Sequence, residues 1–203
     1  MLDFPRALST AIEILCHYGE LMSNIIILNA AARKQGNTSA LVKSFTEGAR
    51  DSGNTVTEFY LQTMTIRGCL GCMGCKGKAD PCTQKDDMSQ IYDAFLKADV
   101  IVLASPVYFL GIAGTLKTAI DRLFAVFAKY GEEECQRDSV LLMTSDDPCY
   151  EETVSWYRGF VDSVGWNNLG EVLGSGNSER AKELGSSIQR SSGIASPFRK
   201  EVK

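Results

Sequence analysis

Four cysteines between residues 69 and 82 form the group of side chains with the most evident chemistry in this sequence. They are spaced C-x2-C-x2-C-x6-C, with glycines among them: Cys69, Cys72, Cys75 and Cys82. Thiolates are the usual ligands of iron–sulfur clusters, and ferredoxin-type sequences use a closely related spacing. Glycines allow the backbone to wrap tightly and to direct its N–H groups at sulfur. The run therefore predicts a [4Fe–4S] site.

Two other interpretations of these cysteines stay open. Structural zinc sites usually combine two C-x2-C pairs that lie a dozen or more residues apart, so zinc is the second choice. The thiols could also be unligated and surround the mouth of a substrate site, because folds retain such loops without filling them. A cluster, a zinc ion and free thiols are the three hypotheses for this loop.

A loop that could bind a phosphate covers residues 30–39. It follows an apolar strand predicted over Ile25–Asn29 and leads into a helix predicted over Ser39–Ser52. Unpaired amides and the dipole at a helix N-terminus favour a bound anion. The residues suited to hold it are Gly36, Asn37, Thr38 and Ser39. Ordinary capping of the helix by Asn37, Thr38 or Ser39 explains the same residues equally well.

An apolar and aromatic loop follows another buried strand, predicted over Val100–Ala104. It covers residues 105–111 and reads Ser-Pro-Val-Tyr-Phe-Leu-Gly. Solvated loops rarely carry so much apolar surface, so we expect a flat and partly apolar ligand to cover this one. The alternative is that Tyr108 and Phe109 pack into the core. A third polar loop, which begins with Ser145 and Asp146, follows a further strand.

Strands and helices alternate along the chain, which predicts an α/β fold with a doubly wound parallel sheet of five strands and helices on both faces. Apolar runs predict the strands, and helical spacing follows each of them. The strands are expected at residues 25–29, 55–61, 100–104, 139–144 and 169–173. The helix after the third strand is expected to bury a face that starts at Ile112 and ends at Phe127.

Right-handed crossovers would place the loops at residues 30–39, 105–111 and 145–148 along one edge of this sheet. That edge, at the carboxyl ends of the strands, is where open α/β sheets bind ligands. One of the loops suits a phosphate and another suits a flat ring. Flavin mononucleotide has both parts, so FMN is the predicted cofactor.

Composition and charge exclude several other classes of function. The chain has 203 residues, of which 44% are hydrophobic and 23% charged, enough for one well-buried core. A net charge of −4 without a basic stripe argues against nucleic acid as a partner. No run of about 20 apolar residues predicts a membrane span. With His17 as its only histidine, the chain is a poor candidate for a serine or cysteine triad.

The sequence divides into one domain with two appendages. Residues 1–21 are expected to be an N-terminal extension that contains a short amphipathic helix, and residues 191–203 a flexible C-terminal tail. Residues 22–190 are expected to form the FMN-binding domain. The seven cysteines are an odd set without a recognisable secretion signal, so a reducing, cytoplasmic setting is predicted.

The sequence resembles the flavodoxin-like NAD(P)H-dependent FMN reductases, and among them most of all the iron–sulfur flavoproteins. The resemblance covers roughly residues 25–189 and depends on three motifs in a fixed order. They are Arg33-Lys34-Gln35-Gly36-Asn37-Thr38, the four-cysteine run followed by Lys85-Asp86-Asp87-Met88, and Ser105-Pro106-Val107-Tyr108-Phe109 followed by Leu116-Lys117 and Ile120-Asp121-Arg122.

The resemblance implies a flavodoxin-like dimer or tetramer that binds FMN non-covalently. The phosphate would be held by Arg33, Gly36, Asn37, Thr38 and Ser39, and a cluster by Cys69, Cys72, Cys75 and Cys82. The ring and its surroundings would be lined by Ser105, Pro106, Val107, Tyr108, Phe109, Gly111, Ser145 and Asp146. Family members often have Gly-Ser-Pro before the phosphate arginine. Here Ala30-Ala31-Ala32 stands instead, so one hydroxyl is missing from the expected cradle.

The implied activity is that of an FMN-dependent oxidoreductase. NAD(P)H or a reduced, ferredoxin-like carrier would supply the electrons. A quinone, a nitro or azo compound, or the [4Fe–4S] cluster would accept them. The flavin carries the chemistry, so no catalytic side chain is predicted. The alternative is a non-enzymatic flavin and iron–sulfur electron carrier or redox sensor.

Overall fold

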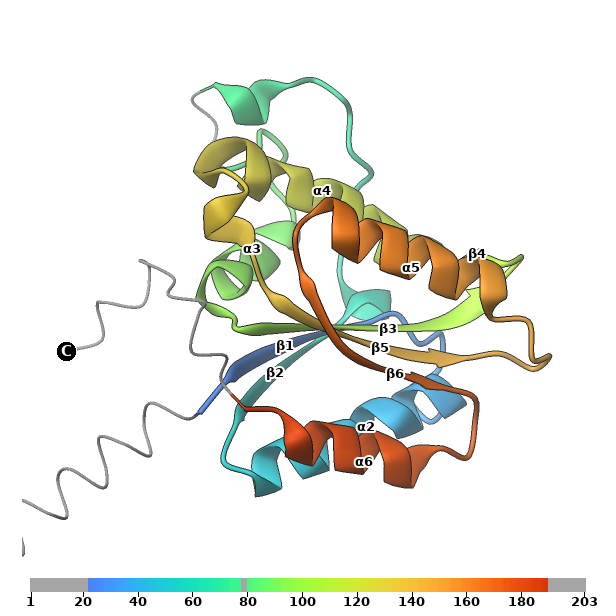
Figure 1. Ribbon diagram of the computed structural model, residues 1–203. Helices are drawn as coiled ribbons and strands as arrows, with labels where there is room; N and C mark the ends of the chain where they lie inside the picture. Colours follow the sequence, from blue (N-terminus) through green and yellow to red (C-terminus); the bar gives the residue numbers. More distant parts are fainter. Residues whose placement is uncertain (1–21, 78–79, 190–203) are drawn as a thin grey trace, which may run out of the picture.

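The computed structural model describes residues 22–77 and 80–189, which form a parallel sheet between two layers of helices (Figure 1). The helix predicted within residues 1–21 and the tail predicted over residues 191–203 lie outside the described residues. Within the described residues, no helix is long and apolar enough to cross a membrane.

Five parallel strands run in the order β2-β1-β3-β5-β6, which confirms the predicted flavodoxin-like sheet. Pairing is in register from Ile25 opposite Val100 to Asn29 opposite Ala104, and one irregularity lies between Ser139 and Val140. The strands are β1 (Asn24–Asn29), β2 (Thr55–Tyr60), β3 (Val100–Tyr108), β5 (Asp138–Thr144) and β6 (Asn167–Leu173).

Strand β1 shows why these apolar runs become central strands. Successive side chains of a strand point to opposite faces, so a strand that is covered on both sides must be apolar throughout. Ile25 and Ile27 pack into the core on one face of the sheet, whereas Ile26 and Leu28 pack into the core on the other. The unbroken run from Ile25 to Leu28 therefore supplies both cores.

Helices α2 and α6 cover one face of the sheet, and α3, α4 and α5 cover the other (Figure 1). The helices are α2 (Asn37–Asp51), α3 (Met88–Lys97), α4 (Gly114–Tyr130), α5 (Glu151–Ser163) and α6 (Ser178–Ser187), and the short 3-10 segments are η1 (Leu61–Thr63), η2 (Gly74–Lys76) and η3 (Glu133–Cys135). The prediction of helices on both faces is confirmed.

The segment after residue 104 differs from the predicted loop. Strand β3 continues to Tyr108 and turns back into the two-residue strand β4 (Gly111–Ile112), which pairs with it antiparallel. Buried Ser105 holds this hairpin, because its hydroxyl donates to the Pro106 carbonyl (2.7 Å) and accepts from the Ala113 amide (2.8 Å). Helix α4 therefore begins only at Gly114, and the prediction of Ile112 on its buried face is wrong.

Helices α2 and α6 approach each other through glycine. A Cβ atom on Gly185 would stand 2.2 Å from the carbonyl oxygen of Phe45, and one on Gly48 would stand 2.0 Å from that of Lys182. Both obstacles are backbone atoms, which cannot turn aside as a flexible side chain can. The two glycines therefore set the separation of these helices.

We expect Gly185→Ala to lower the free energy of unfolding by about 1–3 kcal/mol, because the added methyl group overpacks the contact between α2 and α6. Gly159→Ala in α5 is the matched control. Apart from its chain neighbours and the nearby backbone of α5, no described atom lies within 4 Å of a Cβ atom at Gly159, so this change should stabilise the protein by about 0.4–1 kcal/mol. Urea unfolding measures both effects, and equal shifts in the two variants would contradict the packing argument.

Candidate functional site

Three loops meet at the carboxyl edge of the sheet, beside the point where the chain leaves two neighbouring strands toward opposite faces. Strands β1 and β3 are neighbours, but α2 follows β1 on one face and α4 follows β3 on the other. Such a switch point leaves a crevice outside the strand ends. The crevice, here called the three-loop hollow, is lined by Ala31, Ala32, Arg33, Gly36, Asn37, Thr38, Pro106, Val107, Tyr108, Thr144, Ser145 and Asp146.

One end of the three-loop hollow is the N-terminus of α2. Gly36 is its cap residue, and within the described residues no side chain makes a capping hydrogen bond there. The amide of Ala40 donates the first helical bond, to the Gly36 carbonyl at 3.0 Å. The amides of residues 37–39 precede that bond and are the groups by which helix N-termini hold anions. The alternative of an ordinary side-chain cap is therefore wrong.

Hydrogen bonds hold this loop in shape. The Gly36 amide donates to the Arg33 carbonyl at 3.0 Å, and the Ser39 hydroxyl donates to the same oxygen at 2.9 Å. The buried hydroxyl of Thr38 lies 2.6 Å from that of Thr144, at the end of β5. The start of α2 is thus fixed to the strand that carries the third loop.

The other end of the hollow includes apolar and aromatic residues. Pro106, Val107 and Tyr108 come from the extended end of β3, and the Tyr108 side chain is half exposed. Beside them, just after Thr144, the Ser145 amide donates to the Tyr150 hydroxyl at 2.9 Å, which fixes the third loop. The hollow therefore joins an anion site to a wall against which a ring can lie.

Most of the predicted cofactor-binding residues line this hollow, but four of them lie elsewhere. Ser39 faces a groove between α2 and β2, and the Ser105 side chain is buried in the hairpin. Phe109 is fully exposed at the hairpin tip, beside Gly111. Their predicted contacts with a cofactor stay predictions.

Sequence reasoning missed two features of the hollow. Thr144 lines it, and only its place as the last residue of a strand could have shown this. Ala31 and Ala32, which appeared only as a departure from the family pattern, line it as well. Small side chains there leave room for a ligand beside Arg33. The residues present fit FMN, whose phosphate needs donors and whose ring needs a flat wall.

The four cysteines surround a second hollow, which lies against α4. This cysteine hollow is lined by Cys69, Leu70, Gly71, Cys72, Met73, Cys75, Cys82, Gln84, Asp121, Arg122, Phe124 and Ala125. All four thiols are free, and Cys69 and Cys72 are exposed. A hydrogen bond with the Thr83 hydroxyl lowers the pKa of the Cys72 thiol, which favours the thiolate form that ligates metals.

The thiols are not gathered as the ligands of a single ion. Within residues 22–77 and 80–189, no three His, Cys, Asp or Glu side chains converge closely enough to hold one metal ion. The four cysteines nevertheless line one hollow, and four thiolates are the ligand set of an iron–sulfur cluster.

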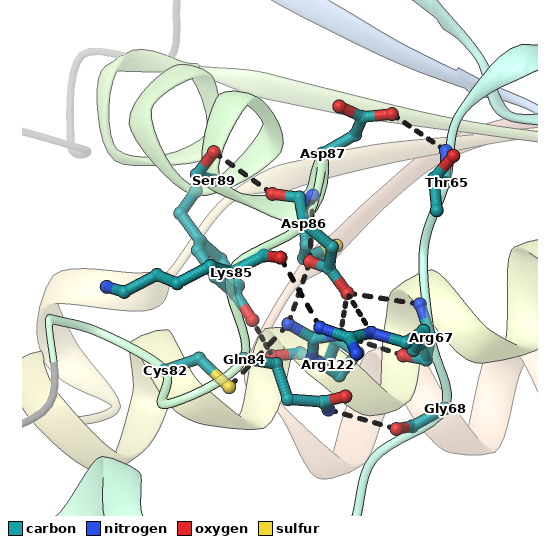
Figure 2. A network of polar contacts seen from close by, with 12 residues as sticks. Thr65, Arg67, Gly68, Cys82, Gln84, Lys85, Asp86, Asp87, Ser89 and Arg122 are labelled. Carbon is teal, nitrogen blue, oxygen red and sulfur yellow. Dashed lines mark hydrogen bonds and ion pairs between the residues drawn. The ribbon is translucent and has the colours of Figure 1, made fainter.

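A buried ion pair fastens the loop that carries the cysteines (Figure 2). The side chains of Arg122 and Asp86 are 1% and 3% exposed, and two hydrogen bonds of 2.7 and 3.1 Å join them. Arg122 also donates to the Arg67 carbonyl at 2.7 Å. The Asp86 carboxylate accepts from the amides of Arg67 (3.1 Å) and Met88 (3.2 Å). The pair thus connects both ends of the loop to α3 and α4.

The charge of Asp86 is well supported. Burial alone would raise the pKa of this carboxyl group, but the hydrogen bonds from Arg122 and from the two amides outweigh it. The pKa therefore lies below its ordinary value, and the carboxylate is charged at neutral pH.

The chain is similar to a family model and to several known proteins. A family model described as NADPH-dependent FMN reductase matches residues 23–147. An iron–sulfur flavoprotein of Archaeoglobus fulgidus is 35% identical over 91 residues, which are 45% of this chain and 41% of that protein. This chain thus matches less than half the length of that relative.

Solved structures share the fold. The NAD(P)H:quinone oxidoreductase of Methanothermobacter marburgensis has a TM-score of 0.67 at 19% identity, covering 81% of this chain and 95% of that one. An azoreductase of Bacillus anthracis has a TM-score of 0.60 at 16% identity, covering 82% and 100%. At such low identity the likeness concerns the flavodoxin-like fold alone.

We expect Asp86→Asn to lower the free energy of unfolding at pH 7 by about 3–5 kcal/mol, because it leaves the buried charge of Arg122 uncompensated. The pKa of Asp86 is lower in the folded protein than in the unfolded chain. Its stabilisation is therefore complete above about pH 5, begins to fall near the unfolded value of about 3.9, and is lost as the pH falls through the lower folded-state pKa. The variant should lose less stability than the wild type over that range.

Denaturant unfolding at pH 7, 5 and 3.5 measures this difference. Asp121→Asn is the control, because Asp121 forms an exposed pair with Lys117 in the same helix. Removing that pair should cost less than about 1 kcal/mol. Parallel pH profiles for the wild type and Asp86→Asn would contradict the assigned role of the carboxylate.

Proposed function

We propose that this chain, which belongs to the NADPH-dependent FMN reductase family, is an FMN-dependent oxidoreductase that passes electrons from NAD(P)H or a reduced carrier to a small acceptor. One observation carries the proposal. The uncapped start of α2 and the wall formed by Pro106, Val107 and Tyr108 line a single hollow.

The phosphate end of the cofactor is assigned to the start of α2. The amides of residues 37–39 and the Arg33 side chain supply donors and positive charge. The Asn37 side chain stands at the rim of the same hollow. The Thr38 hydroxyl is shared with Thr144, so it positions the helix and its amides rather than acting as a free donor.

The ring end is assigned to the wall of β3 and to the Ser145–Asp146 loop. Bound flavin would supply hydride and electron transfer by itself, so no acid or base of the protein has to take part. The task of this chain is to orient the ring and to exclude water on one side. Tyr108 supplies aromatic surface for this purpose, and the Ser105 hydrogen bonds hold the hairpin that carries it.

The cysteine hollow is assigned to a [4Fe–4S] cluster with Cys69, Cys72, Cys75 and Cys82 as ligands. The placement of all four cysteines around one hollow, with their thiols free, supports this assignment. The name of the Archaeoglobus fulgidus relative, an iron–sulfur flavoprotein, supports it further. The cluster would accept electrons from the flavin or deliver them to it.

The names of the similar proteins point to the class of acceptor. Quinones and azo compounds are named for two of the structures that share the fold. We propose an acceptor of this kind, or a nitro compound, for the present chain. The exposed apolar hairpin tip at Phe109 and Leu110 supports assembly into a homodimer or homotetramer. Six free cysteines among the described residues support a reducing, cytoplasmic setting.

Tyr108→Ala and Asn37→Ala should each weaken FMN binding, by about tenfold or more. The first change removes ring contact worth about 1.5 kcal/mol and the second removes a contact at the phosphate end. Quenching of flavin fluorescence measures the affinity. Phe109→Ala is the matched aromatic control, because its side chain lies outside the three-loop hollow and should change the affinity less. Unchanged affinity in both Tyr108→Ala and Asn37→Ala would overturn the site.

Oxidation of pyridine nucleotide distinguishes an enzyme from an electron carrier. FMN-loaded protein should oxidise NADH or NADPH continuously when a quinone, an azo dye or a nitroaromatic compound is present. The loss of absorbance at 340 nm follows this reaction. If the protein is a carrier or a sensor, it will bind FMN but will exchange electrons only with a reduced carrier protein such as a ferredoxin.

A further inference from the structure

Arg122 occupies an unusual position in the wall of the cysteine hollow. It projects from α4, is 1% exposed, and reaches both ends of the cysteine loop. At one end it donates to the Arg67 carbonyl, two residues before Cys69. At the other end its Nη2 atom lies 3.6 Å from the sulfur of Cys82 (Figure 2). A single side chain therefore contacts the last cysteine and the segment that leads to the first.

One N–H group of the Arg122 guanidinium makes no hydrogen bond within the described residues. Both Nη atoms donate to Asp86, and they reach Arg67 and Cys82 as well. The Nε–H group is buried and has no partner among the described residues. Buried donors normally find an acceptor, because an unmade hydrogen bond is costly. An unpaired donor on a side chain that lines the hollow indicates that an acceptor is to be expected there.

Asp86 fixes the direction of a second donor, the Nη2–H group that reaches Cys82. Two parallel N–H to oxygen bonds hold a planar guanidinium in one orientation, which a lysine ammonium cannot reproduce. The Tyr92 hydroxyl adds a bond of 3.1 Å to the Arg122 carbonyl and holds the backbone of α4 beneath it. The N–H group that faces Cys82 is therefore held in place before any ligand binds.

We propose that Arg122 is a positioning residue for the iron–sulfur site, which holds the Cys82 thiolate by a hydrogen bond and makes the bound cluster easier to reduce. This inference rests on the cluster assigned in the proposed function. Hydrogen bonds to the cysteine sulfurs and the nearby charge set the potential of such clusters. A positive, hydrogen-bonding group favours the reduced form, which carries one more negative charge. Burial strengthens the effect, because screening by water is weak there.

The test compares reduction potentials in the full chain, loaded with FMN and reconstituted anaerobically with iron and sulfide. Arg122→Lys keeps the positive charge beside Asp86 but loses the planar fork that reaches Cys82. At a fixed mediator potential, we expect its cluster to accept an electron about tenfold less readily, a shift of about 59 mV toward negative potential for a one-electron couple. EPR-monitored redox titration measures the shift.

Two further variants complete the comparison. Arg158→Lys is the matched control, because Arg158 forms a similar two-bond pair with Glu171, away from the cysteine hollow, and its potential should equal that of the wild type. Asp86→Glu keeps the negative charge but moves the carboxylate by one methylene group, which displaces the Nη2 donor from Cys82. Its potential should therefore fall, as in Arg122→Lys. This second variant decides the matter if Arg122→Lys takes up no cluster.

The outcomes separate this role from the proposed function. A wild type that binds FMN but takes up no iron overturns the cluster assignment and the role of Arg122 together. A cluster whose potential is the same in the wild type and in Arg122→Lys overturns the role of Arg122 alone. An unchanged potential in Asp86→Glu also overturns it. A lower potential in both variants, with FMN affinity unchanged, establishes it.

Discussion

The pairing of β1 with β3, each buried on both faces, is the constraint on which the rest of the structure depends. Five consecutive pairs from Ile25 to Asn29 hold the two strands together, and their side chains supply both cores. Because both faces need a covering layer, the chain leaves β1 into a helix on one side and β3 into a helix on the other. The crevice between the two strand ends follows from that division.

The elements that could be predicted from the sequence are those determined by local pattern. Apolar runs gave the strands, since backbone burial depends on nearby residues. The polar residues after β1 gave a helix start at Ser39, two residues after the observed start at Asn37, and the cap residue, Gly36, was not predicted. The hairpin after Ala104 could not be predicted, because it depends on the Ser105 hydroxyl bonding to Ala113, eight residues away. Its turn also holds Phe109 and Leu110 at φ values of 49° and 60°, which propensity does not favour for bulky residues.

The candidate site also has one part that local pattern predicts and another that depends on contacts between distant residues. Spacing alone indicated the four cysteines, because ligand runs are local. The part that Arg122 plays could not be read in this way, since its contacts are with Asp86, 36 residues away, and Arg67, 55 residues away. A buried ion pair is weak support for stability, because desolvation offsets much of the attraction. The desolvation cost of burying Arg122 and Asp86 is easier to understand if the ion pair also orients an N–H group of Arg122 toward a ligand.

Helix α4 runs from the hairpin beside the three-loop hollow to the cysteine hollow. It begins at Gly114, just after the β3–β4 hairpin, whose first strand, β3, lines the three-loop hollow. Eight residues later it carries Arg122 at the cysteine hollow. At 1.5 Å per residue the two positions are about 12 Å apart along the helix. The helix is anchored just before its start by Ser105 and in its middle, at Arg122, by Asp86, so neither of these two points can shift independently. A rigid element of this length would hold the proposed FMN and the proposed cluster at a constant separation.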